Sequence, residues 1–170
     1  CSSDLITLIE GQVKSSLLAG LDPTPEHLNG FVSISHLFEA GILLYARRQY
    51  SEAFGLFKRC SLQIDKFSDN TKSEVYRYLG MTSVRTSDGK MASICITKLR
   101  AKISSAPVAD FVEAFRAEVI ERNFPRAATL YHLAWKDAHE KSQKSREARA
   151  IRSYISVALK TPDPDYGDLA

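Results

Sequence analysis

The chain has 170 residues, of which 44% are hydrophobic and 25% charged, and its formal net charge is +3. This length suits one domain with a real core, and the composition is that of a globular protein, not of a disordered or fibrous one. So small a net charge gives no reason to expect a nucleic-acid or membrane partner.

The cysteines and the first residues bear on the compartment. Cys1, Cys60 and Cys95 are odd in number and show no CxxC spacing, which argues against a disulfide framework and against a zinc site. A reducing compartment is therefore expected, cytoplasmic or alternatively nuclear. The start at Cys1 followed by two serines fits a cut inside a longer protein, and a lipidated bacterial N-terminus is the minority alternative.

No stretch of the sequence is expected to cross a membrane or to direct secretion. The most apolar run, 31–46, contains Ser33, Ser35, His36 and Glu39 and is too short for a span. No signal peptide is recognisable. No cofactor and no metal ion are expected either.

Residues 1–30 are expected to form a leading helix and a linker. Ser3 or Asp4 is available as an N-cap, and Gly20 with the turn at 22–25 ends the helix. The helix either caps the open edge of the helical repeats, which is the favoured interpretation, or forms a homodimer through a wider apolar stripe. The capping face consists of Leu5, Ile6, Ile9, Val13 and Leu17, and Leu8, Leu18 and Leu21 widen it.

The strongest pattern in the chain lies between residues 37 and 60. Small and apolar residues recur there at gaps of three and four, interrupted by a polar turn at 47–49, which predicts two antiparallel helices. Gly41 and Ala53, facing each other, would let the two helices approach closely. The residues of the pattern are Leu37, Gly41, Leu44, Tyr50, Ala53, Phe57 and Cys60.

Two weaker copies of this pattern lie further along the chain. A shift of 39 residues gives a match except at Ser83 and Gly89, and a further shift of 35 residues gives the second copy. In that copy the first helix fits poorly, because Phe115 stands where a small residue is expected and Glu118 where an apolar one is. The matching positions are Tyr76, Gly80, Ala92, Ile96 and Leu99, then Phe111, Phe124, Ala127, Tyr131 and Ala134.

These repeats, over roughly 33–138, resemble tetratricopeptide (TPR) units, whose signature places small and large apolar residues at such intervals. The resemblance implies an all-α fold: a short right-handed superhelix of antiparallel helix pairs, with about three units and an extra helix at each end. It implies one domain over 1–160, with repeats at 31–140, a closing helix at 141–160 and a flexible tail at 161–170. The residues expected to pack the repeats are Gly41, Tyr50, Ala53, Phe57, Gly80, Ala92 and Ala127.

Periodicity and turn signals place the individual helices after the leading one. Pro125 suits a first-turn position, where its missing N–H costs nothing. The expected helices run from 26 or 31 to 47, then over 50–66, 72–86, 89–103, 108–122, 125–140 and 141–160. The last of them is expected to turn inward a face made of Ala148, Ile151, Tyr154, Ile155, Ala158 and Leu159.

The resemblance also implies where a partner would bind. In a TPR stack the first helix of each pair lines a concave groove that receives an extended peptide or a helix. Here the groove would have an apolar floor crossed by arginines, suited to an amphipathic segment that carries acidic groups. A chaperone-tail adaptor is not expected, because the positions that clamp a terminal carboxylate hold Phe38, Ile42, Tyr78 and Ala109. The expected groove residues are Phe38, Ile42, Tyr45, Arg77, Met81, Arg85 and Arg116.

Catalytic patterns are scarce. There is no HExxH, phosphate loop or nucleophile elbow, and the one catalytic spacing is Arg126-x5-His132, similar to the motif of the all-helical HEPN ribonucleases. A histidine there would take the proton of a 2′-hydroxyl while the arginine stabilises phosphate charge. On a regular helix, however, these two side chains lie on different faces. The basic start of the last helix, with Lys144, Arg149 and Arg152, is interpreted as a solvated face.

The sequence therefore predicts a non-enzymatic protein-binding module, an adaptor or scaffold that works inside a multi-subunit assembly. A soluble chaperone of a secretion system, which shares the length and the leading helix, is the alternative within the binding class. A HEPN-like ribonuclease using Arg126 and His132 is the alternative from another class. No nucleic acid is expected as a partner under the main prediction.

Overall fold

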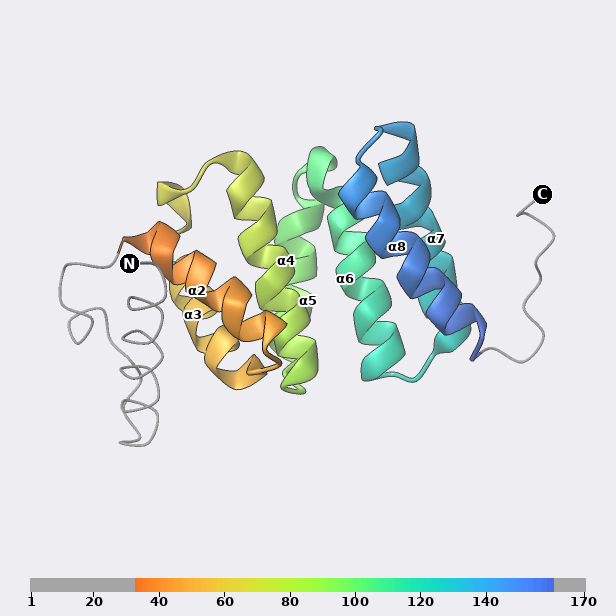
Figure 1. The fold of residues 1–170 in the computed structure, drawn as a ribbon, viewed down its shortest axis with the longest axis horizontal. Helices are drawn as coiled ribbons and strands as arrows, with labels where there is room; N and C mark the ends of the chain where they lie inside the picture. The colour runs from red at the N-terminus through yellow and green to blue at the C-terminus, as the bar shows by residue number, and fades with distance from the viewer. Residues whose placement is uncertain (1–32, 161–170) are drawn as a thin grey trace. The chain divides into compact units, whose positions relative to one another are not determined.

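The computed structural model describes residues 33–160 (Figure 1). Within this range the chain forms seven α-helices, two short 3-10 helices and no strand, which confirms the predicted all-α class. The predicted leading helix and the predicted tail lie outside the described residues. In the part of the chain that the structure describes, no helix is long and apolar enough to cross a membrane.

The helices agree closely with those expected from periodicity. The helices expected over 50–66 and 89–103 end earlier, at residues 62 and 100, and a short 3-10 helix follows each of them before the next α-helix. The α-helices are α2 (Ile34–Ala46), α3 (Tyr50–Leu62), α4 (Asp69–Arg85), α5 (Gly89–Arg100), α6 (Ala106–Val119), α7 (Phe124–Glu140) and α8 (Lys144–Ala158), and the 3-10 helices are η1 (Ile64–Lys66) and η2 (Ile103–Ser105).

Four turns between successive helices share one backbone conformation. Arg48, Ser87, Arg122 and Ser142 each adopt a left-handed φ, between 53° and 63°, and each stands two residues before a helix begins. The residue between is the N-cap, with φ near −85° and ψ between 71° and 82°. A left-handed non-glycine residue is uncommon, so its fourfold recurrence marks a repeated hairpin rather than four chance turns.

The third of these turns explains the poor fit of the last repeat. In the other three, the N-cap N–H bonds to a carbonyl five residues earlier, as Gln49 does to Leu44 at 2.9 Å. Asn123 instead bonds to Ala117, six residues earlier, also at 2.9 Å. This turn is one residue longer than the others. The position that Gly41 and Gly80 occupy in the first two repeats therefore falls at Ala114 in the third, and not at Phe115. Ala114 and Ala117 are both fully buried.

The chain divides into two compact units at residues 82 and 83. In the first unit α2 and α3 form a hairpin that packs through Gly41. A Cβ placed on Gly41 would stand 2.7 Å from Cε1 of Phe57, closer than real Cβ atoms approach their neighbours. The Phe57 ring, itself fully buried, thus lies directly on the glycine, while the predicted partner Ala53 is also fully buried.

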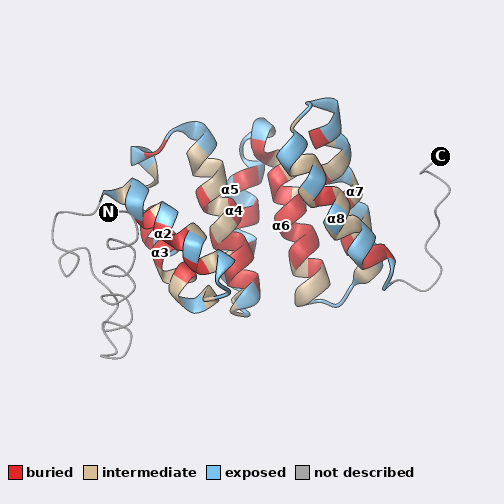
Figure 2. Cartoon of the chain, in the orientation of Figure 1, coloured by how far each residue is buried: buried red, intermediate tan, exposed pale blue. Residues whose placement is uncertain are grey.

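The second unit consists of the end of α4 and α5 to α8, in which consecutive helices pack on one another. The buried residues follow the inward sides of the helices, and α6, between α5 and α7, has eight of its 14 residues buried (Figure 2). The Tyr131 ring is fully buried and meets Phe111 edge to face at 5.3 Å.

The inward face predicted for the closing helix, which is α8 in the structure, is wrong in part. Ala148, Ile155 and Leu159 are exposed, whereas Ala150, Val157 and Ala158 are buried. The α7 side chains decide this rotation, because His132 meets the Tyr154 ring at 5.7 Å and His139 bonds to Glu147 at 2.8 Å. The apolar pattern of the helix alone allowed either side.

The close contact at Gly41 predicts a specific loss of stability. We expect Gly41→Ala to lower the free energy of unfolding by about 1–3 kcal/mol, because the added methyl must displace the Phe57 ring in a filled core. Urea unfolding followed by circular dichroism measures this difference.

Gly89, the first residue of α5, is the control, since no atom beyond its own turn of helix lies within 4 Å of its built Cβ. Gly89→Ala should leave stability unchanged or raise it by up to about 1 kcal/mol through helix propensity. Equal effects of the two substitutions would contradict the packing described at Gly41.

Candidate protein-binding surface

Aromatic side chains gather on one face of the first unit. Phe38, Ile42 and Tyr45 are spaced four and three residues apart, so they form one stripe along α2. Tyr78 of α4 lies against this stripe, with its ring 6.0 Å from Phe38 and 5.5 Å from Tyr45. All four side chains are partly exposed. We call Phe38, Ile42, Tyr45 and Tyr78 the aromatic face.

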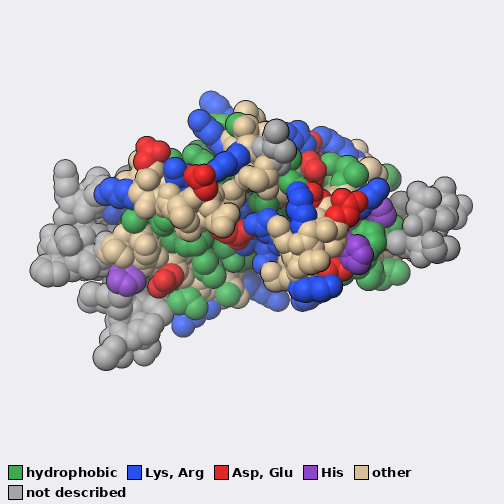
Figure 3. Space-filling view, turned by 90° about the horizontal axis from the view of Figure 1, so that it is seen from above, with side chains coloured by type: hydrophobic (Ala, Val, Ile, Leu, Met, Phe, Trp, Pro, Cys, Tyr) green, Lys and Arg blue, Asp and Glu red, His purple; other side chains and the backbone are tan. Residues whose placement is uncertain are grey.

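The aromatic face rests on a buried ring. Tyr78 stacks on Phe57 with centroids 5.1 Å apart and planes 15° apart, and Phe38 meets Phe57 edge to face at 5.9 Å. Phe67, also buried, contacts Phe38 at the same centroid distance. Such offset and edge-to-face pairs hold rings in fixed orientations. The face is therefore a supported surface, and hydrophobic side chains are among those exposed on the side of the molecule seen in Figure 3.

Arg77, which was expected to cross the groove floor, is instead buried with 4% of its surface exposed. Its Nε and Nη2 donate to Oε2 of Glu74 at 2.9 and 2.6 Å, and its Nη1 lies 3.4 Å from Sδ of Met81. The guanidinium also lies 4.0 Å from the centre of the Tyr78 ring. Burial opposes the charged form, yet the charge and hydrogen bonds of Glu74, together with Tyr78, outweigh it and raise the pKa of Arg77. Its charge is thus compensated inside the protein, next to Tyr78.

The remaining predicted groove residues divide between the two units. Met81 lies in the first unit and is buried. Arg85 and Arg116 belong to the second, where Arg85 stacks over the Phe115 ring at 4.7 Å. Arg116 donates to Glu121 at 3.0 Å and to Ser93 at 2.7 Å. The structure thus brings Phe38, Ile42, Tyr45, Arg77 and Met81 together in one unit.

The residues predicted to pack the repeats are mostly in the core. Tyr50 alone among them is partly exposed, and its ring lies 5.4 Å from Tyr45 at the end of the aromatic face. The buried members are Gly41, Ala53, Phe57, Gly80, Ala92 and Ala127.

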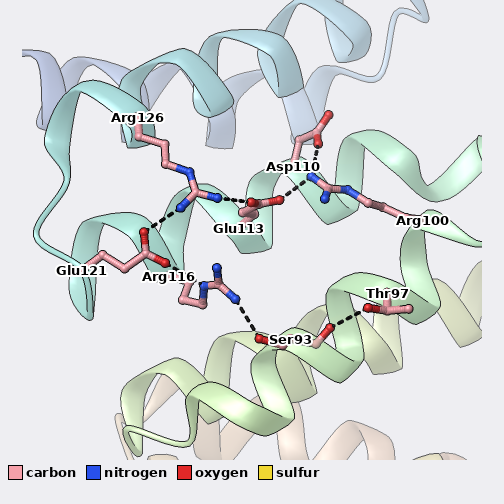
Figure 4. Close-up of polar contacts among 8 residues, drawn as sticks. All are labelled: Ser93, Thr97, Arg100, Asp110, Glu113, Arg116, Glu121 and Arg126. Atoms are coloured by element: carbon pink, nitrogen blue, oxygen red, sulfur yellow. Dashed lines mark hydrogen bonds and ion pairs between the residues drawn. The ribbon is translucent and has the colours of Figure 1, made fainter.

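A charge network that no short-range pattern indicated joins three helices of the second unit (Figure 4). The Glu113 carboxylate of α6 lies between Arg100 of α5 and Arg126 of α7 and pairs with both. Arg126 also pairs with Glu121 at 2.8 Å, and Arg100 with Asp110 at 3.2 Å. With Arg116, three arginines face three carboxylates, so the network is neutral. The network links α5, α6 and α7, and it presents no net charge that would attract a ligand.

Arg126 and His132 do not form a joint site. Arg126 donates hydrogen bonds to Glu113 of α6 and to Glu121 in the turn that follows α6. His132 instead lies among rings of α7 and α8, 5.4 Å from Trp135 and 5.7 Å from Tyr154. The six residues between them turn the side chains toward different helices.

The histidine, cysteine and acidic residues of the described range do not gather into a metal-binding group of three or more. Cys60 and Cys95 are free thiols, both fully buried. Burial raises the pKa of each to about 12. At neutral pH both are neutral core side chains.

Comparison of the chain with protein-family models, with curated proteins and with solved structures finds no match. The candidate site is therefore inferred from the structure of this chain alone. Among residues 33–160, the aromatic face combines exposure, apolar character and rigid support.

The pair of Glu74 and Arg77 predicts an unequal response to two similar substitutions in α4. Glu74→Gln should lower the free energy of unfolding by about 1–3 kcal/mol, because it leaves the buried Arg77 charge without its partner. Asp69→Asn removes the partner of Lys72, an exposed pair at 3.8 Å. This control should change stability by less than about 0.5 kcal/mol. Thermal or urea unfolding of both variants gives the comparison, and equal effects would show that Arg77 does not depend on Glu74.

The cysteine environment predicts the accessibility of the thiols. In a Cys1→Ser variant, neither Cys60 nor Cys95 should react with Ellman's reagent at about pH 8 while the protein is folded, because both are buried and protonated. Two thiols should react once urea unfolds the chain. Rapid reaction of one thiol in the folded protein would contradict the described packing.

Proposed function

We propose that this chain is a TPR-like helical-repeat module that binds a helix or peptide of another protein through the aromatic face. The proposal includes the right-handed superhelix expected from the repeats. It also includes a role as an adaptor or scaffold in a multi-subunit assembly of the cytoplasm or nucleus. Free buried thiols support a reducing compartment.

The observation that carries the proposal is the partly exposed row of rings on α2 and α4. Tyrosine and phenylalanine are enriched in protein interfaces because a rigid ring buries much apolar area for little loss of conformational entropy. Ile42 stands between Phe38 and Tyr45 on the same stripe, so the surface can receive the apolar side of an amphipathic helix. The stacked support beneath Tyr78 keeps this surface formed before a partner arrives.

The position of Arg77 refines the kind of partner. Its guanidinium already pairs with Glu74 and lies over the Tyr78 ring. Arg77 therefore contributes to binding by holding Tyr78 in position, and not by pairing with an acidic group of the partner. We therefore propose that apolar and aromatic contacts supply most of the affinity. Acidic residues of the partner would add to it at the edge of the contact.

A single substitution tests the surface. We expect Ile42→Lys to abolish capture of a defined partner set from a lysate of the source organism, because it places a charge in the middle of an apolar contact. Ile42 has no ring contact of the kind that fixes Phe38 and Tyr45, so the fold should persist, and circular dichroism checks this. Quantitative mass spectrometry of the captured proteins is the measurement.

Leu43→Lys is the matched control. Leu43 is the next residue of α2 and is 37% exposed, but one residue along a helix turns its side chain about 100° away from Ile42. The control should capture the same proteins as the wild type. If Ile42→Lys captures them as well, the aromatic face is not the binding surface.

A further inference from the structure

One buried cation of the first unit has no counter-charge in the part of the chain that the structure describes. Arg59 of α3 exposes 8% of its surface, and its Nε and Nη1 are buried with no hydrogen-bond partner. Burial lowers its pKa, because burial disfavours the charged form. An arginine nevertheless keeps its charge in proteins, and a buried charge without a partner is strongly destabilising. A carboxylate is the group that would compensate it.

Arg59 lies away from the aromatic face. It is two residues from Phe57, which turns it about 200° around α3, to the other side of the helix. Gly55, Arg59 and Leu62 are spaced four and three residues apart and form a stripe there, which we call the outer α3 stripe. Space is open beside Gly55, and Leu62 is 79% exposed. The stripe thus combines a buried cation, room for another element and an uncovered apolar side chain.

The start of α2 lies near the outer α3 stripe. The Sγ of Cys60, the residue after Arg59, lies 3.9 Å from the carbonyl oxygen of Ile34, to which it donates. The first turn of α2 therefore lies beside the last turns of α3. Residues 1–32 join α2 at this point, so they are connected to the molecule next to Arg59.

The sequence of this leading segment contains a suitable acid. In the helix predicted over 4–19, Glu10 is seven residues from Leu17 and so lies within about 20° of that side chain, at the border of the apolar face. Asp4 lies about 140° from Leu17, on the other side of the helix. On the predicted helix, Glu10 and not Asp4 is therefore the acidic residue that borders the apolar face.

We propose that the leading helix docks on the outer α3 stripe of its own chain, with the Glu10 carboxylate accepting hydrogen bonds from the Arg59 guanidinium. The apolar face of the helix then covers Leu62. The contact closes the first unit on the side away from the aromatic face, so both surfaces can be occupied at once.

A double-mutant cycle on the full chain tests the proposed pair. Glu10→Gln should lower the urea midpoint of unfolding in the wild type but leave it unchanged in an Arg59→Met background, because the carboxylate then has no partner to lose. Asp4→Asn is the control and should have the same effect on the midpoint in both backgrounds, because Asp4 has no part in the proposed pair. The exchange Glu10→Arg with Arg59→Glu should restore a midpoint that each single reversal lowers.

Two results would overturn the proposal. Equal midpoint shifts for Glu10→Gln in both backgrounds would show that Arg59 does not meet this carboxylate. Coupling accompanied by a dimer mass in light scattering, with a midpoint that rises with protein concentration, would place the helix on a second copy of the chain. A monomer with coupled residues is the expected result.

Discussion

The Phe57 ring is the contact on which the first unit depends. It fills the space that Gly41 leaves on α2, meets Phe38 edge to face and stacks on Tyr78 of α4. One fully buried side chain thus joins three helices, and a glycine is needed opposite it because a methyl group would already collide. The aromatic face is the outer layer of this same cluster. Its exposed rings are positioned by a ring that solvent does not reach.

Most charged side chains near the core are compensated within the protein. Arg77 is paired with Glu74, and Glu113 holds Arg100 and Arg126 across α5, α6 and α7. Such pairs fix the arrangement of helices more than they add net stability. They also leave few buried cations for a partner to use. Recognition through rings and aliphatic side chains is consistent with this distribution, and Arg59 is the exception that calls for a carboxylate.

The sequence was sufficient to predict the helices, because polar turns and helical spacing are local signals. It placed Gly41 and Phe57 in the core for the same reason. It could not align the third repeat, since one extra residue in the turn before Asn123 shifts the small position to Ala114. The inward side of α8 was missed because its apolar residues are spread around the helix, and contacts from His132 and His139 choose between the sides.

The candidate site was predicted less completely than the fold. Phe38, Ile42 and Tyr45 were found because a stripe on one helix is visible in the sequence. Burial of Arg77 could not be inferred, although Glu74 three residues earlier was a signal that it had a partner. The Glu113 network was not foreseen, because its members are 10 and 13 residues apart and meet only when helices pack. Long-range pairs of this kind need the three-dimensional structure.

Hydrogen–deuterium exchange with and without a captured partner tests the central claim most directly. The claim is that the aromatic face of α2 and α4 receives the partner. The account predicts slower exchange over 34–46 and 69–85 in the complex, with exchange over 124–158 unchanged. Protection confined to α7 and α8, with α2 and α4 exchanging as in the free protein, would contradict it.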